Sequence, residues 1–186
     1  MKRLSFMTML ILAFLMCAAR INNAEAQVSV SHKAFFEGIK KFCGQSFEGV
    51  TQFPKNSDDP FAGKKLVITI ADCDQKEIRI PFQVGEDKSR TWMLKMDETG
   101  LLLKHDHRHT DGTPDKITMY GGWATPNGTA HKQNFPADPE TKNLIPEAAT
   151  NVWTIEIDNN KQELVYSLER HNKPRYRAVF NLSPKQ

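Results

Sequence analysis

The chain has 186 residues and a formal net charge of +3, from 25 basic and 22 acidic residues. Residues 1–26 contain three of the basic residues and one of the acidic ones, so the remaining 160 residues carry a net charge of +1. This balance gives no electrostatic case for a nucleic-acid partner, which would need a basic surface. A length of 160 residues indicates one domain, residues 27–186, with a single buried core.

Residues 1–26 have the features of a secretory signal peptide. Two basic residues begin the segment, an apolar core covers residues 7–19, and an A-x-A cleavage pattern ends it at residues 24–26. The apolar core is too short to span a membrane, which takes about 20 residues. A lipoprotein attached through Cys17 is less well supported, because Met16 stands where a small side chain is needed. A retained interfacial anchor is the other alternative. We expect a secreted or periplasmic protein without a membrane span after cleavage.

Two cysteines, Cys43 and Cys73, follow the cleavage pattern. An even number of cysteines in an exported chain predicts one disulfide. Closing a loop of this length stabilises a fold by roughly 3–4 kcal/mol in the chain-entropy model. The alternative is two separate buried thiols. A catalytic cysteine is not expected, since the bridge would use both.

Residues 31–42 contain the only good helical pattern in the chain. Ser31 can cap the start of this helix, and Gly44 can end it. Four apolar side chains recur at helical spacing on one face: Phe35, Phe36, Ile39 and Phe42. Such a helix is expected to pack as a plug or lid against an apolar surface.

After Gly44 the chain has the alternation of apolar and polar residues that is typical of β-strands. About ten short strands are predicted, at residues 46–53, 66–71, 77–84, 91–97, 101–109, 117–125, 129–134, 151–157, 163–169 and 175–182. Hairpin-length connections favour an antiparallel meander with a single apolar interior. The predicted fold class is therefore all-β, an antiparallel up-and-down barrel with one short N-terminal helix, because closure removes exposed sheet edges. A two-sheet sandwich is the alternative.

Local signals refine the second half of this strand pattern. Gly121 and Gly122 interrupt a strand interior and predict a bend or a close backbone approach. The Asn127-Gly128 pair is a strong hairpin signal, so residues 129–134 should return beside the preceding strand. Residues 136–146 contain three prolines and are predicted to be a loop.

The order of these elements resembles that of the calycin group, the lipocalins and their relatives, over roughly residues 31–182. These proteins place a short helical segment before an antiparallel barrel, so the resemblance implies a cavity for a small ligand. The lipocalin Gly-x-Trp motif corresponds here to Gly44 and Phe47, with one extra residue between them and phenylalanine in place of tryptophan. The resemblance also implies that Arg177 packs against Phe47.

A second resemblance is carried by the sequence LKHDHRHTDG, which is followed by MYGG. Both stretches are similar to a group of exported bacterial proteins. This resemblance implies export and supplies no activity.

The most informative stretch of the chain is GLLLKHDHRHTDG, residues 100–112. Alternate residues of a strand share a face, so His105, His107 and His109 follow two leucines along one side. That side changes from apolar to imidazole, as expected where a strand leaves a core and enters a polar cavity. The other side is expected to be solvated and carries Lys104, Asp106 and Arg108.

A metal site is one function that these histidines suggest, because neutral imidazole is a common metal ligand. With a rise of about 3.3 Å per residue, His105 and His109 start about 13 Å apart and cannot bind one ion together. A neighbouring pair, either His105 with His107 or His107 with His109, can bind a transition metal such as zinc. The third ligand would be His131, which lies one predicted hairpin beyond the adjacent strand.

Two other interpretations of the histidines stay open. They can line a polar barrel mouth and hydrogen-bond to carboxylates, tyrosines or water. They can also contact a ligand directly, together with an aromatic wall of Trp92, Trp123 and Tyr120, and one of them can bind a haem iron. Each tryptophan can equally belong to the core.

The chain has no Gly-x-Ser-x-Gly, phosphate-binding loop or His-Glu-x-x-His motif, so no catalytic residues are assigned. The leading prediction is an exported protein that binds a small, partly apolar ligand in a barrel cavity lined by His105, His107 and His109. The rival predictions are a metal-dependent enzyme whose H-x-H site is completed by His131, and a structural or interaction module with a filled core.

Overall fold

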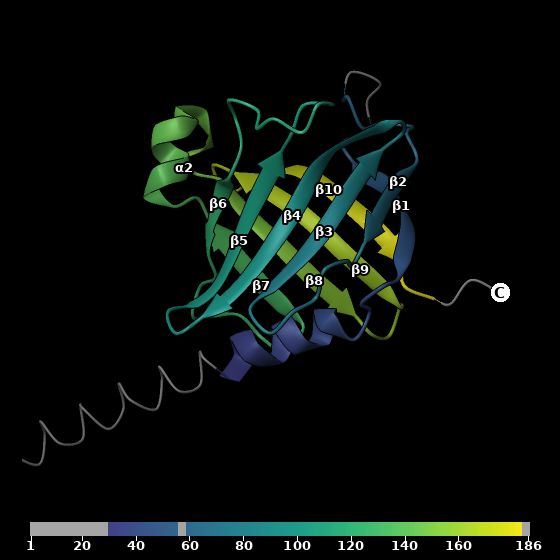
Figure 1. Cartoon of the computed structure of the whole chain (residues 1–186), viewed down its shortest axis with the longest axis vertical. Coiled ribbons are helices and arrows are strands. Elements are labelled where there is room, and N and C mark those ends of the chain that lie inside the picture. Colours follow the sequence, from purple (N-terminus) through teal and green to yellow (C-terminus); the bar gives the residue numbers. More distant parts are fainter. Residues whose placement is uncertain (1–29, 56–58, 184–186) are drawn as a thin grey trace, which may run out of the picture.

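Ten antiparallel strands of the computed structural model wrap into a nearly closed barrel, with a helix across one end (Figure 1). The structure describes residues 30–55 and 59–183. The predicted signal peptide, residues 1–26, lies outside the described residues. The strands are β1 (Ser46–Phe53), β2 (Leu66–Thr69), β3 (Glu77–Val84), β4 (Asp87–Asp97), β5 (Gly100–His107), β6 (Tyr120–Trp123), β7 (Lys132–Pro136), β8 (Val152–Asp158), β9 (Glu163–Arg170) and β10 (Lys173–Asn181).

The order of the strands in the sheet is β6-β5-β4-β3-β2-β1-β10-β9-β8-β7. Except for β6 and β7, strands that are consecutive in the chain therefore pair with each other, and the first strand pairs with the last, as Val50 does with Val179. This topology confirms the predicted all-β, up-and-down barrel in place of a two-sheet sandwich. It is also compatible with a calycin-like architecture.

Inward-facing apolar side chains fill the middle of the barrel. As the alternation predicts, Ile80 of β3 and Leu94 of β4 are fully buried. Three large rings meet at this level, where the ring of Phe82 lies 5.0 Å from that of Trp92 and 6.0 Å from that of Phe180, between centroids. Burial of each such side chain contributes about 1.5–3 kcal/mol. The middle of the barrel is a packed core, so space for a ligand must lie nearer an end.

The N-terminal helix, residues 30–40, covers the end of the barrel at which β5 begins (Figure 1). Phe35, Phe36 and Ile39 are fully buried and belong to the barrel core, which confirms the predicted plug. Beside them, the buried His32 donates from Nε2 to the carbonyl oxygen of Thr125, 3.4 Å away. Over residues 30–55 and 59–183, no helix has the length and apolar character needed to cross a membrane.

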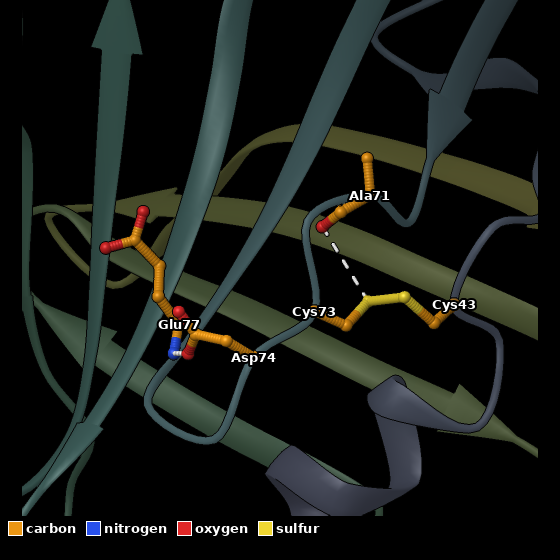
Figure 2. The surroundings of a disulfide bond; sticks show 5 residues. All are labelled: Cys43, Ala71, Cys73, Asp74 and Glu77. Carbon is orange, nitrogen blue, oxygen red and sulfur yellow. Dashed lines mark hydrogen bonds between the residues drawn. A yellow bond between two sulfur atoms is a disulfide. The ribbon is translucent and has the colours of Figure 1, made fainter.

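The predicted disulfide between Cys43 and Cys73 is present, with Cα atoms 6.2 Å apart. It joins the turn after the N-terminal helix to the connection between β2 and β3 (Figure 2). Asp74 orders this connection, because its Oδ1 accepts a hydrogen bond of 2.6 Å from the backbone N–H of Glu77. Cys73 Sγ also lies 3.7 Å from the carbonyl oxygen of Ala71. This is a contact and not a hydrogen bond, because a disulfide sulfur carries no hydrogen to donate. The bridge therefore fastens the plug to the barrel wall.

β6 and β7 are the two ends of the sheet order, and close backbone contacts join them. The backbone N–H of Asp138 donates to the carbonyl oxygen of Gly121 at 2.9 Å. A Cβ added to Gly122 would lie 1.8 Å from the carbonyl oxygen of Pro136, so only glycine permits this approach. The close approach predicted for the glycine pair is confirmed. The hairpin predicted at residues 127–128 brings the two strands together, but without a regular ladder of β pairing.

A second helix, α2 (Pro139–Leu144), is found where a loop was predicted at residues 136–146, and a 3-10 turn (Pro146–Ala148) follows it. The side chain of Asp138 caps α2 by accepting a hydrogen bond of 2.8 Å from the backbone N–H of Thr141. A proline in the first turn also suits a helix start. The prediction of a loop at residues 136–146 is therefore wrong. A helix of six residues is too short to show the apolar periodicity from which a helix is predicted.

Helix α2 lies beside β6 (Figure 1) and reaches the outer face of β5 through the ion pair of Glu140 with Lys104. Thr141 Oγ1 accepts a 2.7 Å hydrogen bond from the N–H of Gly121 and donates one of 2.9 Å to its carbonyl oxygen. Beneath the helix, the buried Lys104 Nζ lies 2.6 Å from Asp138 and 3.0 Å from Glu140. The prediction that Lys104 is solvated is therefore wrong, because α2 packs over the face that the alternation assigned to solvent.

Asp106 is buried on the same outer face, also against the prediction. Its carboxylate lies 3.0 Å from Arg108 Nε and accepts a 3.0 Å hydrogen bond from Thr118 Oγ1. Arg108 is exposed, as predicted. The connection between β5 and β6 folds back over this face and excludes solvent from the carboxylate.

The contact that the lipocalin resemblance implies between Arg177 and Phe47 is not formed. Arg177 lies opposite Phe53 in the sheet, and its Nε donates to Gln52 Oε1 at 2.7 Å. Phe47 packs edge-on against Phe42, with 5.6 Å between the ring centroids.

Replacing both bridge cysteines by serine is expected to lower the free energy of unfolding by roughly 3–4 kcal/mol, because the loop between them is no longer closed in the unfolded chain. Chemical denaturation of the double variant beside the oxidised wild type measures this loss. A reducing agent should destabilise the wild type by a similar amount and leave the variant unchanged. Two free thiols in the unfolded, unreduced wild type would contradict the bridge.

Replacing Lys104 by methionine is expected to lower the free energy of unfolding by about 3 kcal/mol, because the Asp138 carboxylate stays buried without its cation. The matched control is Lys132→Met. Lys132 is 50% exposed and pairs with Glu156 at 3.1 Å, so its loss should cost less than about 1 kcal/mol. Equal losses for the two variants, measured by denaturant titration, would contradict this account of the buried pair.

Candidate functional site

The end of the barrel opposite the N-terminal helix contains a pocket of about 480 Å³. This volume lies within the range of small-molecule sites. Its residues come from the mouth ends of the strands and from the loops between them: Asp59, Pro60, Phe61, His107, Asp115, Ile117, Tyr120, Ile145, Ala148, Asn151, Trp153, Tyr166, Leu168, Arg170, Arg175 and Tyr176. Aromatic and apolar groups alternate with polar ones around the opening.

His105 lies beneath the pocket, and both of its ring nitrogens are hydrogen-bonded. Nδ1 is 3.1 Å from the carbonyl oxygen of Tyr120, and Nε2 is 2.8 Å from the hydroxyl of Tyr166. A carbonyl oxygen only accepts, so Nδ1 carries the proton and Nε2 accepts from the Tyr166 hydroxyl. Burial lowers the pKa of His105 to about 3, which keeps the ring neutral. In this arrangement His105 has no lone pair free for a metal or a substrate.

Stacked aromatic rings surround His105. Its ring lies parallel to that of Tyr120, with centroids 4.8 Å apart, and Trp153 approaches it at 5.2 Å. On the other side Tyr166 stacks on Trp92, with centroids 4.3 Å apart. Burial raises the pKa of Tyr120 to about 12 and that of Tyr166 well above its ordinary value, so both phenols stay protonated at neutral pH. The floor of the pocket is a rigid, uncharged aromatic layer.

His107 is the histidine that lines the pocket itself. Its Nε2 lies 3.0 Å from the hydroxyl of Tyr120, and the two rings are 5.3 Å apart. Burial, together with the positive charge of Arg90 on the paired strand, lowers the pKa of His107. The ring is therefore neutral at physiological pH and can offer a nitrogen to a ligand.

Arginines stand higher, around the rim of the mouth. Arg90 forms an ion pair with Asp87, and its guanidinium carbon lies 5.1 Å from the centre of the Phe61 ring. Arg170 faces inward from the end of β9, and its Nε donates to Asn151 Oδ1 at 2.8 Å. Arg175 lies at an irregularity in the pairing of β10 with β9 and is exposed at the pocket edge.

Two carboxylates also belong to the rim, and each already accepts a hydrogen bond from its own loop. Asp59 Oδ1 accepts from the backbone N–H of Phe61 at 2.9 Å, and Asp115 Oδ1 accepts from that of Ile117 at 3.0 Å. The hydrogen bond from Ile117 holds the pKa of Asp115 below its ordinary value. Both carboxylates are thus turn residues that use part of their hydrogen-bonding capacity within their own loops.

The structure brings together two of the four histidines predicted as metal ligands. His105 and His107 share Tyr120 as a neighbour, whereas His109 lies exposed beyond the end of β5. His131 is exposed at the plugged end, where Ala130 approaches the N-terminal helix, and its Nδ1 lies 3.3 Å from the side-chain amide of Asn159. Over the described ranges 30–55 and 59–183, no group of three or more histidine, cysteine, aspartate or glutamate side chains is placed to hold one metal ion. The metal site stays a prediction that this arrangement does not support.

The predicted aromatic wall is only partly assembled at the pocket. Tyr120 lines it, while Trp92 lies one layer deeper and is only 2% exposed. Trp123 lies opposite Leu102 in the sheet and is 40% exposed, so it faces away from the barrel interior. Sequence reasoning missed Trp153 of β8, which lines the pocket in its place.

Other pocket residues were also missed, although the alternation of their strands contained the signal. Tyr166, Leu168 and Arg170 are alternate residues of β9 and share the inward face. Their place beside His107 depends on the way the barrel closes, because the chain between β5 and β9 is long. The alternation identifies the inward face but not which strands meet across the mouth.

Comparison with protein-family models gives no match, and neither does comparison with the curated proteins. The function of this chain is therefore inferred from the geometry of the site.

Stability should depend on pH through His105. Its pKa is about 3 in the folded protein and about 6.5 in the unfolded chain, so the unfolded chain binds one more proton between these values. The free energy of unfolding therefore falls as the pH drops from about 6.5 toward about 3, by at most about 1.4 kcal/mol per pH unit.

Replacing His105 by glutamine, which can keep both hydrogen bonds, is expected to reduce the slope of this pH dependence between about pH 4.5 and 6. His107 contributes in the same direction and leaves a residual slope. The control is His131→Gln at the exposed site, which should leave the slope unchanged. If the His105→Gln variant keeps the full slope of the wild type, His105 is not the residue responsible for the pH dependence of stability.

Proposed function

We propose that this protein binds a small, partly apolar molecule at the open mouth of the barrel, and that it does so after export. The observation that carries the proposal is the pocket of about 480 Å³ above a preordered floor of neutral aromatic and imidazole side chains. A site whose polar groups are already held in place spends little binding energy on ordering them. Export, with residues 27–186 as the mature domain, is part of the proposal, and the disulfide supports it.

The proposed ligand occupies the mouth and not the middle of the barrel, because rings such as Phe82 and Phe180 fill the middle. Its apolar part would lie against Leu168, Ile117 and the Trp153 edge, and its polar part would reach His107. This placement modifies the predicted cavity lined by three histidines. His107 would contact the ligand, His105 would position Tyr120 and Tyr166, and His109 would take no part.

A structural or interaction module is the second candidate function, and the packed interior favours it. In that case the mouth would be a shallow surface feature without an affinity for small molecules. A metal-dependent enzyme stays a prediction. Native mass spectrometry of protein taken from its own export pathway, without chelator, tests for a bound metal ion or a bound organic molecule.

Phenylnaphthylamine, an uncharged aromatic dye whose emission rises in apolar surroundings, tests the proposed function directly. The wild type should bind the dye saturably and with one-to-one stoichiometry. Ile117→Glu and Leu168→Glu place a charge in the pocket wall and should weaken binding about tenfold or more. Ile117 is 48% exposed, so its replacement should leave folding intact.

The matched control is Trp123→Glu, because Trp123 is the exposed aromatic residue on the outer face. Dye binding should survive this change. Loss of binding in Trp123→Glu with full binding in both pocket variants would place the dye on the outer surface and contradict the proposal. Absence of saturable binding to the wild type, together with a bare polypeptide in the native mass spectrum, would favour the structural module.

A further inference from the structure

The arginines of the chain differ in whether they already have an ion-pair partner. Three of the arginines in the described chain are ion-paired: Arg79, Arg90 and Arg108. Arg170 and Arg175 line the pocket, and no carboxylate among residues 30–55 and 59–183 lies within 4 Å of either guanidinium. These two guanidinium groups of the pocket therefore have no ion-pair partner among the described residues.

Arg170 is held in a fixed orientation. It continues the inward face of β9 above Tyr166 and Leu168, and its Nε is occupied by Asn151 Oδ1 at 2.8 Å. The guanidinium has five N–H donors, and this bond uses one. The two terminal nitrogens have no partner among the described residues and can present a fork to a planar anion.

The two pocket carboxylates do not occupy the terminal nitrogens of Arg170, which stay available to an anion. Asp59 and Asp115 balance the formal charge of Arg170 and Arg175, but each accepts a backbone hydrogen bond within its own loop. The phenols of the floor also keep their protons, since burial raises the pKa of Tyr120 and Tyr166. No phenolate therefore competes with a bound anion for Arg170.

We infer that the ligand of the mouth pocket carries an anionic group, of the carboxylate or sulfonate type, which binds the terminal nitrogens of Arg170, with Arg175 beside it. This inference rests on the proposed function and specifies the chemical class of its ligand. The anion occupies the β9–β10 side of the rim, and the apolar body lies toward Trp153 and Ile117. The ligand is therefore an amphipathic molecule whose charged end is nearest to solvent.

A matched pair of dyes tests the inference. Anilinonaphthalene sulfonate has the ring system of phenylnaphthylamine with a sulfonate added. The wild type should bind the sulfonate about tenfold more tightly than the uncharged dye, because a charge-assisted hydrogen bond is available to only one of them. Arg170→Gln should remove this difference, so that the ratio of the two affinities, measured on the same variant, falls to about one. Arg170→Lys should retain part of it, since lysine keeps the charge without the fork.

The control for total charge is Arg177→Gln, on the same hairpin. Arg177 pairs with Gln52 outside the pocket and should affect neither dye. If Arg177→Gln loses as much affinity for the sulfonate as Arg170→Gln does, the general surface charge of the protein explains the effect. That result would overturn the inference. Thermal unfolding of each variant confirms that the fold is retained.

The remaining outcomes separate the inference from the proposed function. Equal affinity of the wild type for both dyes, or tighter binding of the uncharged one, overturns the anionic preference and leaves the binding function standing. Binding of neither dye overturns the function and the inference together. Sulfonate binding that Arg170→Gln leaves unchanged places the anion elsewhere and also overturns the assignment.

Discussion

The junction between β6 and β7 is the constraint on which the barrel mouth depends. A sheet of ten strands closes only if its two ends meet, and here they meet through backbone contacts that Gly121 and Gly122 make possible. Helix α2 then holds the outside of the junction through Thr141 and the buried pair of Lys104 with Asp138. This closure sets β5, which carries His105 and His107, and β6, which carries Tyr120, against β8 and β9, which carry the opposite wall of the pocket.

Much of the fold could be predicted from the sequence, because the alternation of residues in β3 and β8 is set by one buried face and one more exposed face. The plug and the disulfide follow from equally local signals, such as helical spacing at Phe35 and Ile39. Helix α2 could not be found in this way. Its stabilising contacts lie on β5 and β6, and the cap at Asp138 is meaningful only once that surface is known.

Less of the candidate site could be predicted. The period of two identified the inward direction of His105 and His107, but it does not indicate which nitrogen is occupied or which strand lies opposite. Tyr120 and Trp123 were assigned to one wall, although residues three apart on a strand face opposite sides, and only Tyr120 faces the interior. Arg170 is separated from the histidines by most of the second half of the chain, so only the closed barrel brings them together.

The bridge between Cys43 and Cys73 affects how the proposed ligand could enter and leave the barrel. It ties the plug to the wall at the closed end, and the packed rings above the plug block the passage through the middle. If the mouth binds the proposed ligand, entry and release both pass the same rim residues, because the plug covers the other end. Changes to the rim residues would then alter the rates of both steps, whereas loss of the bridge would alter only the stability of the plugged end.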